Sequence, residues 1–214
     1  IARLLYELKE SGKAVELLIV DPDVVEGGNI PRSNFCAAEI GSFKAQTLAK
    51  RITLAWGLEC GYSNEAFDAE EHLKQGSTDY RTLTVIVGCV DNHLARRDIH
   101  SAVEKYQGYR SDDAANIWWI DGGNGKASGQ VLLGSMIKRI KPEQHFSGSS
   151  ICRSLPAPSL LHPDLLEKEK PHSKSEMSDG QSCPDRIRLG EQSLNINQRV
   201  AVEMTEMLTA MFLT

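Results

Sequence analysis

The apolar residues at the start of the chain first follow the spacing of a helix and then that of a strand. The helical positions are Ile1, Leu4, Leu5 and Leu8. They predict a helix that stops near Gly12, because a glycine just after the last periodic residue is a common helix end. Residues 15–20 (VELLIV) are almost wholly apolar and end at Asp21. Such a short apolar run predicts a buried strand of a parallel sheet.

The same alternation of elements continues along the chain to residue 133. Helical spacing returns over residues 42–56 and 92–106. Apolar runs rich in β-branched or aromatic residues predict strands over residues 83–90, 117–120 and 130–133. Because strands that alternate with helices form βαβ units, we predict an α/β fold. The expected architecture is a Rossmann-like, doubly wound, mostly parallel sheet with flanking helices.

The chain changes character after residue 146. Residues 147–182 are rich in serine and proline around a charged centre (EKEK), and they predict a long crossover loop. Helical spacing resumes within residues 183–214, and its apolar positions are Val200, Met204, Met207, Leu208 and Met211. We therefore expect three parts: a core over residues 1–146, the crossover loop over 147–182, and a C-terminal helix over 183–214 that packs on the core.

The composition is that of an ordinary globular protein, with 41% apolar and 25% charged residues. The net charge of −5 gives no reason to expect nucleic acid or an anionic membrane as a partner. No apolar run approaches the roughly 18 residues that a spanning helix needs. Five scattered cysteines without a CxxC pair argue against a disulfide framework and a four-cysteine zinc site. We expect a reducing, cytoplasmic setting.

Three predicted strands are each followed by an aspartate, at Asp21, Asp91 and Asp121. Doubly wound sheets bind ligands beyond the carboxyl ends of their strands, so we expect a site at this edge. A carboxylate at Asp21 can accept both hydroxyls of a ribose. A carboxylate at Asp91 can hold Mg²⁺ against phosphate oxygens, or it can cap the helix that begins near Asn92.

Two cations, Arg32 and Lys44, follow the first of these carboxylates. Two cations beside a ribose-binding carboxylate suit a triphosphate better than a neutral sugar. The set predicts attack of an acid on the α-phosphate of ATP. Lys44, Arg32 and Mg²⁺ would stabilise the developing charge, and pyrophosphate would leave.

Four motifs in the first 134 residues occur in a fixed order. They are DxDxVExxNIxR over residues 21–32, GxxKA over 41–45, VDNxxxR over 90–96, and DGG followed by GQV over 121–131. This order resembles the ThiF/MoeB and ubiquitin-activating enzyme superfamily. The resemblance implies a ribose-binding role for Asp21, a phosphate-facing role for Asn29 and Arg32, a phosphate-binding role for Lys44, an Mg²⁺-binding role for Asp91, and a place beside the nucleotide for Asn92.

The tail over residues 182–197 (SCPDRIRLGEQSLNIN) is similar to a narrower group. That group comprises bacterial PRTRC-type ThiF-family proteins and the activating enzymes of Bil-type, bacterial ubiquitin-like antiphage operons. The resemblance implies that Cys183 is the thioester-forming nucleophile and that the setting is antiviral defence. A helix start favours a thiolate, which fits this position. Cys152 is the rival nucleophile. Cys36, Cys60 and Cys89 are expected to be structural.

The chain also departs from the superfamily pattern. The glycine-rich GxGxxG loop of the family is expected before Ile1 and is not in the sequence. The paired CxxC zinc site of many relatives is lacking, so no structural zinc is implied. We expect Arg96 and Arg97 to form a salt-bridged helix face, and Trp118 and Trp119 to lie in the core or a dimer interface.

The resemblance as a whole implies an enzyme that adenylates the C-terminal carboxylate of a ubiquitin-like protein with ATP and Mg²⁺. Cys183 would carry the acyl group as a thioester for a conjugating enzyme, and the protein would be a homodimer. One alternative is a sulfur-carrier adenylyltransferase that needs no enzyme thioester. Another is a non-catalytic scaffold that binds a ubiquitin-like protein. An NAD-dependent oxidoreductase gives no reason for grouping Arg32, Lys44 and Asp91.

Overall fold

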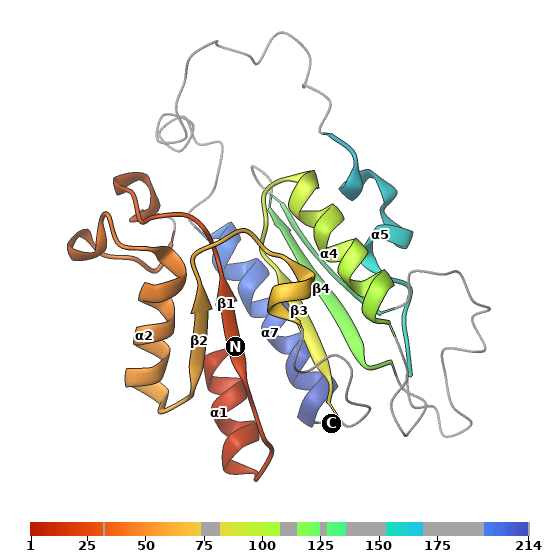
Figure 1. The fold of residues 1–214 in the computed structure, drawn as a ribbon, viewed down its shortest axis with the longest axis horizontal. Helices are drawn as coiled ribbons and strands as arrows, with labels where there is room; N and C mark the ends of the chain where they lie inside the picture. Colours follow the sequence, from red (N-terminus) through yellow and green to blue (C-terminus); the bar gives the residue numbers. More distant parts are fainter. Residues whose placement is uncertain are drawn as a thin grey trace, which may run out of the picture. The chain divides into compact units, whose positions relative to one another are not determined.

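The computed structural model describes residues 1–31, 33–73, 82–107, 115–124, 128–135, 153–168 and 195–213. The described chain is α/β, with short parallel and mixed sheets and flanking helices (Figure 1). It divides into two compact units. The first comprises residues 1–67 and 182–214, and the second comprises residues 68–181.

The first unit is built on two parallel strands, β1 (Leu17–Val20) and β2 (Cys60–Ser63), with Leu17 opposite Cys60 and Val20 opposite Ser63. Helix α2 (Lys44–Trp56) connects them and packs on both, as Figure 1 shows. Its buried residues are Ala45 and Ala49, whose small side chains let the helix lie close to the sheet. The helix ends at Gly57, which has a φ of +61° and so takes the left-handed conformation that favours glycine.

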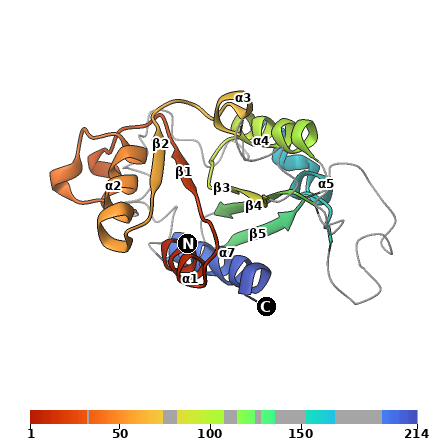
Figure 2. The same cartoon turned by 60° about the horizontal axis from the view of Figure 1, so that its bottom comes forward.

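Two further helices complete the first unit. Helix α1 (Ala2–Glu10) buries Leu4 and Leu8, and helix α7 (Ile196–Leu213) buries Ile196, Met204 and Leu208. The two helices lie side by side in Figure 2. Helix α1 also contacts α2, where the Tyr6 and Trp56 rings are 5.8 Å apart and the Lys9 ammonium donates to the Gly57 carbonyl at 2.8 Å.

The second unit contains a three-stranded mixed sheet in the order β3–β4–β5. Strand β3 (Thr84–Gly88) runs parallel to β4 (Ile117–Asn124), and β4 pairs antiparallel with β5 (Gly129–Gly134). Helix α4 (His93–Tyr106) packs on β3 and β4, and short helix α3 (Ala69–His72) packs on α4. The core residues with no exposed surface include Val103 of α4 and three residues of β4, namely Ile117, Trp119 and Ile120.

Residues 153–168 form an ordered segment of the second unit, although the sequence predicts a loop there. They contain helix α5 (Pro158–Leu161) and the 3-10 turn η4 (Pro163–Leu166). The segment is bound to the sheet by the Ser135 amide, which donates to the Leu155 carbonyl at 2.9 Å. It is bound to α4 by a 2.8 Å hydrogen bond between His100 and Ser159. Packing against α4 and β5 explains the order of this serine- and proline-rich stretch.

The helices predicted over residues 1–8, 42–56 and 92–106 are confirmed as α1, α2 and α4. The structure adds one strand and lengthens another. Strand β2 was not predicted, because its CGYS sequence lacks an apolar run. Strand β4 continues past Asp121 to Asn124, because β5 supplies hydrogen-bonding partners as far as that residue. The predicted beginning of the C-terminal helix, over residues 183–194, lies outside the described residues.

Within the part of the chain that the structure describes, no helix is both long enough and apolar enough to cross a membrane.

Candidate functional site

Asp21 lies directly beyond β1, at the carboxyl edge of the β1–β2 pair. Its backbone N–H donates to the carbonyl of Ser63 at 3.1 Å, which extends the pairing of the two strands by one residue. Its carboxylate accepts a 2.9 Å hydrogen bond from the backbone N–H of Asp23. This side-chain-to-backbone bond is a common way for an aspartate to start a turn. The turn therefore holds Asp21 at the edge where the sequence predicts it.

Lys44 is the first residue of α2, and it meets the same turn. Its ammonium nitrogen lies 2.7 Å from a carboxylate oxygen of Asp23, and its backbone N–H donates to the Asp23 carbonyl at 2.9 Å. The Lys44 side chain is 18% exposed, whereas that of Asp23 is 64% exposed. The structure therefore brings Asp21 and Lys44 together through Asp23. Sequence reasoning gave Asp23 no role, although the D-x-D spacing places it two residues after Asp21.

The backbone around Lys44 is fixed by a short antiparallel contact between the two loops. Val24 forms a β-bridge with Phe43, and Val25 donates to the Ser42 carbonyl at 2.8 Å. The Gly41 N–H returns a 2.9 Å bond to the Val25 carbonyl, and the Val25 side chain is buried. Gly41 has a φ of +87°, which an L side chain rarely adopts. These bonds determine where α2 begins, and hence where its N-terminal amides and Lys44 lie.

Asn29 is buried in the 3-10 turn η1 (Gly27–Asn29). Its side-chain oxygen accepts from the Glu26 N–H at 2.8 Å, and its own N–H donates to the Glu26 carbonyl at 2.9 Å. The structure thus gives the Asn29 oxygen a local role in shaping the loop. Arg32, the predicted second cation of the site, lies outside the described residues.

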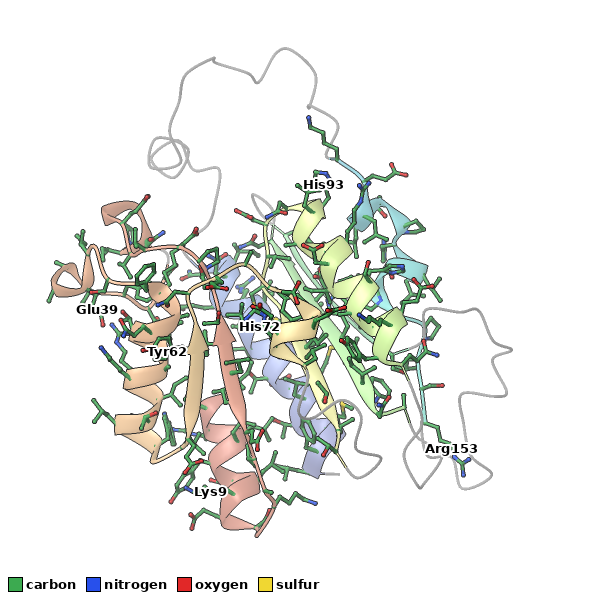
Figure 3. The ribbon with its side chains drawn as sticks, viewed as in Figure 1. Lys9, Glu39, Tyr62, His72, His93 and Arg153 are labelled. Atoms are coloured by element: carbon green, nitrogen blue, oxygen red, sulfur yellow. The ribbon has the colours of Figure 1, made fainter. Side chains whose placement is uncertain are left out.

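The loop before α2 is held to that helix by Arg51. The Arg51 guanidinium binds the Glu39 carboxylate and the Asn34 carbonyl, and it lies over the Phe35 ring at 5.9 Å. The pKa of Glu39 is lowered, first by the hydrogen bond from Arg51 and then by the Cys36 N–H. Figure 3 labels Glu39 in this loop, and Tyr62 on β2, whose hydroxyl accepts from Gln46 of α2 at 3.0 Å.

Asn64 is an additional polar residue at the carboxyl edge of β2. It follows Ser63, whose carbonyl accepts from the Asp21 N–H. Its side-chain oxygen is buried and receives no hydrogen bond from any residue that the structure describes. Leaving such an acceptor unsatisfied costs about 1–3 kcal/mol, so a donor supplied by a ligand would be favoured here. No sequence motif identified Asn64.

In the second unit, Asp91 and Asn92 lie between β3 and α4, both exposed. Asn92 is the N-cap of α4, because its side-chain oxygen accepts from the Ala95 N–H at 2.9 Å. Its side-chain amide donates to a carboxylate oxygen of Asp91 at 3.2 Å. The helix cap is therefore Asn92, and Asp91 keeps an exposed carboxylate at the positive end of the helix dipole.

The sequence predicts that Asp121 follows a strand at the ligand-binding edge, but the structure places it inside β4. It is fully buried within β4 and forms an ion pair with Arg96 of α4, whose Nε donates to both carboxylate oxygens at 3.3 and 3.2 Å. Burial raises the pKa of Asp121, whereas Arg96 and the neighbouring indole N–H of Trp119 act in the opposite direction. That buried indole nitrogen makes no well-formed hydrogen bond within the described part of the chain.

The expected ion pairing of Arg96 is confirmed, whereas Arg97 donates to the Leu166 carbonyl at 2.7 Å.

Three cysteines are described, and all three are free thiols: Cys36, Cys60 and Cys89. Partial burial raises the pKa of Cys60. Desolvation by the surrounding protein, followed by the charge of Asp121, raises the pKa of Cys89, although Cys89 is exposed at the surface. A raised pKa keeps a thiol protonated and disfavours a nucleophilic role. The predicted nucleophile Cys183 and its rival Cys152 lie outside the described residues.

Among the described residues, no three His, Cys, Asp or Glu side chains gather as a ready-made metal site. Mg²⁺ is usually held by only one or two carboxylates together with substrate phosphates. The exposed Asp91 carboxylate, oriented by Asn92, fits that requirement. Asp21, Asn29 and Lys44 belong to the first unit, and Asp91 and Asn92 belong to the second.

Comparison with models of known protein families gives no match for the chain, and comparison with curated proteins gives no match either.

Proposed function

We propose that this chain is an ATP-dependent adenylyltransferase of the ubiquitin-activating type, built on a Rossmann-like, doubly wound sheet. The observation that carries the proposal is the turn after β1, where Asp21 and Lys44 are both bonded to Asp23 at the carboxyl edge of a parallel strand pair. A ribose-binding carboxylate and a phosphate-binding lysine belong at this edge in nucleotide-binding α/β folds. The four motifs that resemble the ThiF/MoeB superfamily add Arg32 and Asp91.

In the proposed reaction, Asp21 accepts hydrogen bonds from the ribose hydroxyls and so fixes the nucleotide along the sheet edge. Lys44 and Arg32 bind the phosphates and stabilise the charge that develops on the α-phosphate. Asn29 shapes the loop between these residues through its bond to Glu26. When Mg²⁺ is bound, it neutralises phosphate charge, and Asp91 would hold it.

The carboxylate of a ubiquitin-like protein attacks the α-phosphorus, and the bond to the bridging oxygen breaks as pyrophosphate leaves. The thiolate of Cys183 then attacks the acyl carbon of the adenylate. AMP departs with the electron pair of the broken C–O bond, and a thioester remains for a conjugating enzyme. We also propose that the protein acts as a homodimer in the cytoplasm.

The test is ATP–pyrophosphate exchange by the protein in its natural full length, with ubiquitin-like proteins from neighbouring genes as acceptors. A non-reducing gel follows the adduct in wild type, Cys183→Ala and the control Cys36→Ala. We expect exchange in all three, and a thiol-sensitive adduct in wild type and the control but not in Cys183→Ala. Exchange without an adduct would replace this proposal with the sulfur-carrier route. Absence of exchange with every acceptor would reject it in favour of a non-catalytic scaffold.

A second pair of variants tests the nucleotide site itself. Lys44→Ala removes the cation at the start of α2, whereas Lys50→Ala removes an exposed lysine two turns further along the same helix. We expect ATP affinity to fall at least about tenfold in Lys44→Ala, because a charge-assisted hydrogen bond is worth about 1.5–3 kcal/mol. Equal ATP affinity in the two variants would remove Lys44 from the site.

A further inference from the structure

Helix α4 and strand β4 are joined by a buried ion pair beside the Asp91 loop. Arg96 donates through Nε to both oxygens of Asp121, and the two side chains are only 11% and 0% exposed. The planar guanidinium is therefore held in one orientation by a residue in the middle of the sheet.

A second nitrogen of the Arg96 guanidinium reaches the residue that precedes Asp91. Its Nη2 donates to the Val90 carbonyl at 2.9 Å, so one guanidinium links β4 to the residue immediately before Asp91. On the other side of Asp91, Asn92 is anchored to the first turn of α4 through the Ala95 N–H and donates to the Asp91 carboxylate. Both neighbours of Asp91 are thus hydrogen-bonded to α4: Val90 through its backbone carbonyl and Asn92 through its side chain.

The packing below the loop leaves little freedom for the ion pair to move. A Cβ on Gly88, the last residue of β3, would lie 2.9 Å from the Trp119 indole nitrogen and 3.1 Å from an Asp121 carboxylate oxygen. The first distance is shorter than normal Cβ contacts and the second is tight, so a side chain at residue 88 would displace the Trp119 indole and crowd the Asp121 carboxylate. The end of β3 therefore packs closely against the Asp121 side of the ion pair.

We propose that Arg96, held by Asp121, is the positioning residue that sets the geometry of the Asp91 carboxylate toward a divalent cation carried by the nucleotide. The proposal rests on the proposed function, because the cation is expected only with bound ATP. Asp91 is fully outside the strand and exposed, so without this support its backbone would share the freedom of an ordinary loop. Partners that orient a metal-binding carboxylate commonly change metal affinity by about 10- to 100-fold when replaced.

The decisive variant is Arg96→Lys. Lysine keeps the charge opposite Asp121, but it cannot contact both Asp121 and the Val90 carbonyl through a rigid fork. The matched control is Arg97→Lys, the next residue of α4, whose side chain donates to Leu166 and not to the Asp91 loop. Asp121→Asn is the second variant, since the amide oxygen still accepts one bond from Arg96.

Two readouts are needed, and the first requires no ligand. Hydrogen exchange of the amides over residues 89–93 should become faster in Arg96→Lys and unchanged in Arg97→Lys, while amides in β4 remain protected in both. The second readout is the Mg²⁺ concentration that gives half-maximal ATP–pyrophosphate exchange. It should rise about 10-fold or more in Arg96→Lys, rise less in Asp121→Asn, and stay at the wild-type value in Arg97→Lys.

The outcomes distinguish a failure of the positioning role of Arg96 from a failure of the proposed adenylyltransferase function. Faster amide exchange with an unchanged Mg²⁺ requirement, or no change in either readout, would overturn the positioning role while leaving the adenylyltransferase standing. A wild-type protein that neither exchanges pyrophosphate nor binds Mg·ATP would overturn the proposed function first, and the positioning role with it. A general loss of protection in β4 of Arg96→Lys would show a purely structural role, which also overturns the assignment.

Discussion

The ammonium nitrogen of Lys44 lies 2.7 Å from the carboxylate of Asp23, so the first residue of α2 is paired with the loop after β1. This pair is open to solvent on the Asp23 side, where the side chain is 64% exposed. Exposed ion pairs contribute only about 0.2–1 kcal/mol to stability. A phosphate that binds Lys44 must compete with the Asp23 carboxylate.

Asp23→Asn is therefore expected to lower the free energy of unfolding by less than about 1 kcal/mol and to increase the affinity for ATP. Urea denaturation gives the first quantity, and titration calorimetry with ATP gives the second. A loss of ATP affinity would instead mean that the Asp23 carboxylate contributes to binding.

Gly134→Ala is expected to destabilise the second unit severely. The new Cβ would lie 1.9 Å from the Pro156 carbonyl oxygen and 2.7 Å from the Ala157 Cα, which are backbone atoms that cannot rotate away. The control is Gly123→Ala in the same hairpin, where the Cβ meets only the flexible Gln130 side chain at 3.2 Å. We expect a loss of about 3 kcal/mol or more for Gly134→Ala and less than about 1 kcal/mol for Gly123→Ala. Similar urea midpoints for the two variants would contradict the close packing of residues 156–157 on β5.

Asn92→Ala should lower the free energy of unfolding by about 1 kcal/mol, because α4 loses the side chain that accepts from its Ala95 amide. Asn92→Ser retains a capping oxygen and should recover most of this loss. Both values follow from urea denaturation. If Ala and Ser were equivalent, the contribution of Asn92 would lie in its bond to Asp91.

The burial of Asp121 predicts a pH dependence of stability. Since its pKa is raised in the folded chain, the folded state keeps a proton that the unfolded chain releases near pH 4. The contribution of Asp121 to the free energy of unfolding is therefore largest in acid. It falls as the pH rises from about 4 to the raised pKa, and is constant above it.

Asp121→Asn removes this titration. The difference in unfolding free energy between wild type and Asp121→Asn should decrease as the pH rises through that window, when measured by urea denaturation from about pH 4 to about pH 8. A difference that increases with pH would show that the attraction of Arg96 outweighs the burial of the carboxylate.

Sequence patterns predicted the helices and strands that depend mainly on residues close to one another in the sequence. The spacing of apolar residues located α1, α2 and α4, and the change from strand to polar residues placed Asp21 and Asp91 beyond β1 and β3. Strand β2 (CGYS) has no run of apolar side chains, and it is a strand because Leu17–Val20 pair with it. Its existence depends on tertiary pairing, which periodicity does not encode.

The contacts of the candidate site were less predictable for the same reason. Lys44 and Asp23 are 21 residues apart, and Arg96 and Asp121 are 25 residues apart, so only the folded chain determines these pairings. Asp121 looked like a strand end because glycines follow it, yet these glycines continue β4 in the hairpin with β5. The sequence offered Asp91 as a possible cap of α4, but the hydrogen bond from the Ala95 N–H shows that the cap is Asn92.

Residues 158–166 run along α4 in the direction opposite to that of the helix. Ser159 is bonded to His100, whereas the later residue Leu166 accepts from Arg97, so the segment travels toward the start of the helix. Leu166 therefore lies nearer than Ser159 to the start of α4, where Figure 3 labels His93. A single hydrogen bond thus joins two residues 69 positions apart in the sequence, Arg97 and Leu166, in the half of α4 that Asn92 caps.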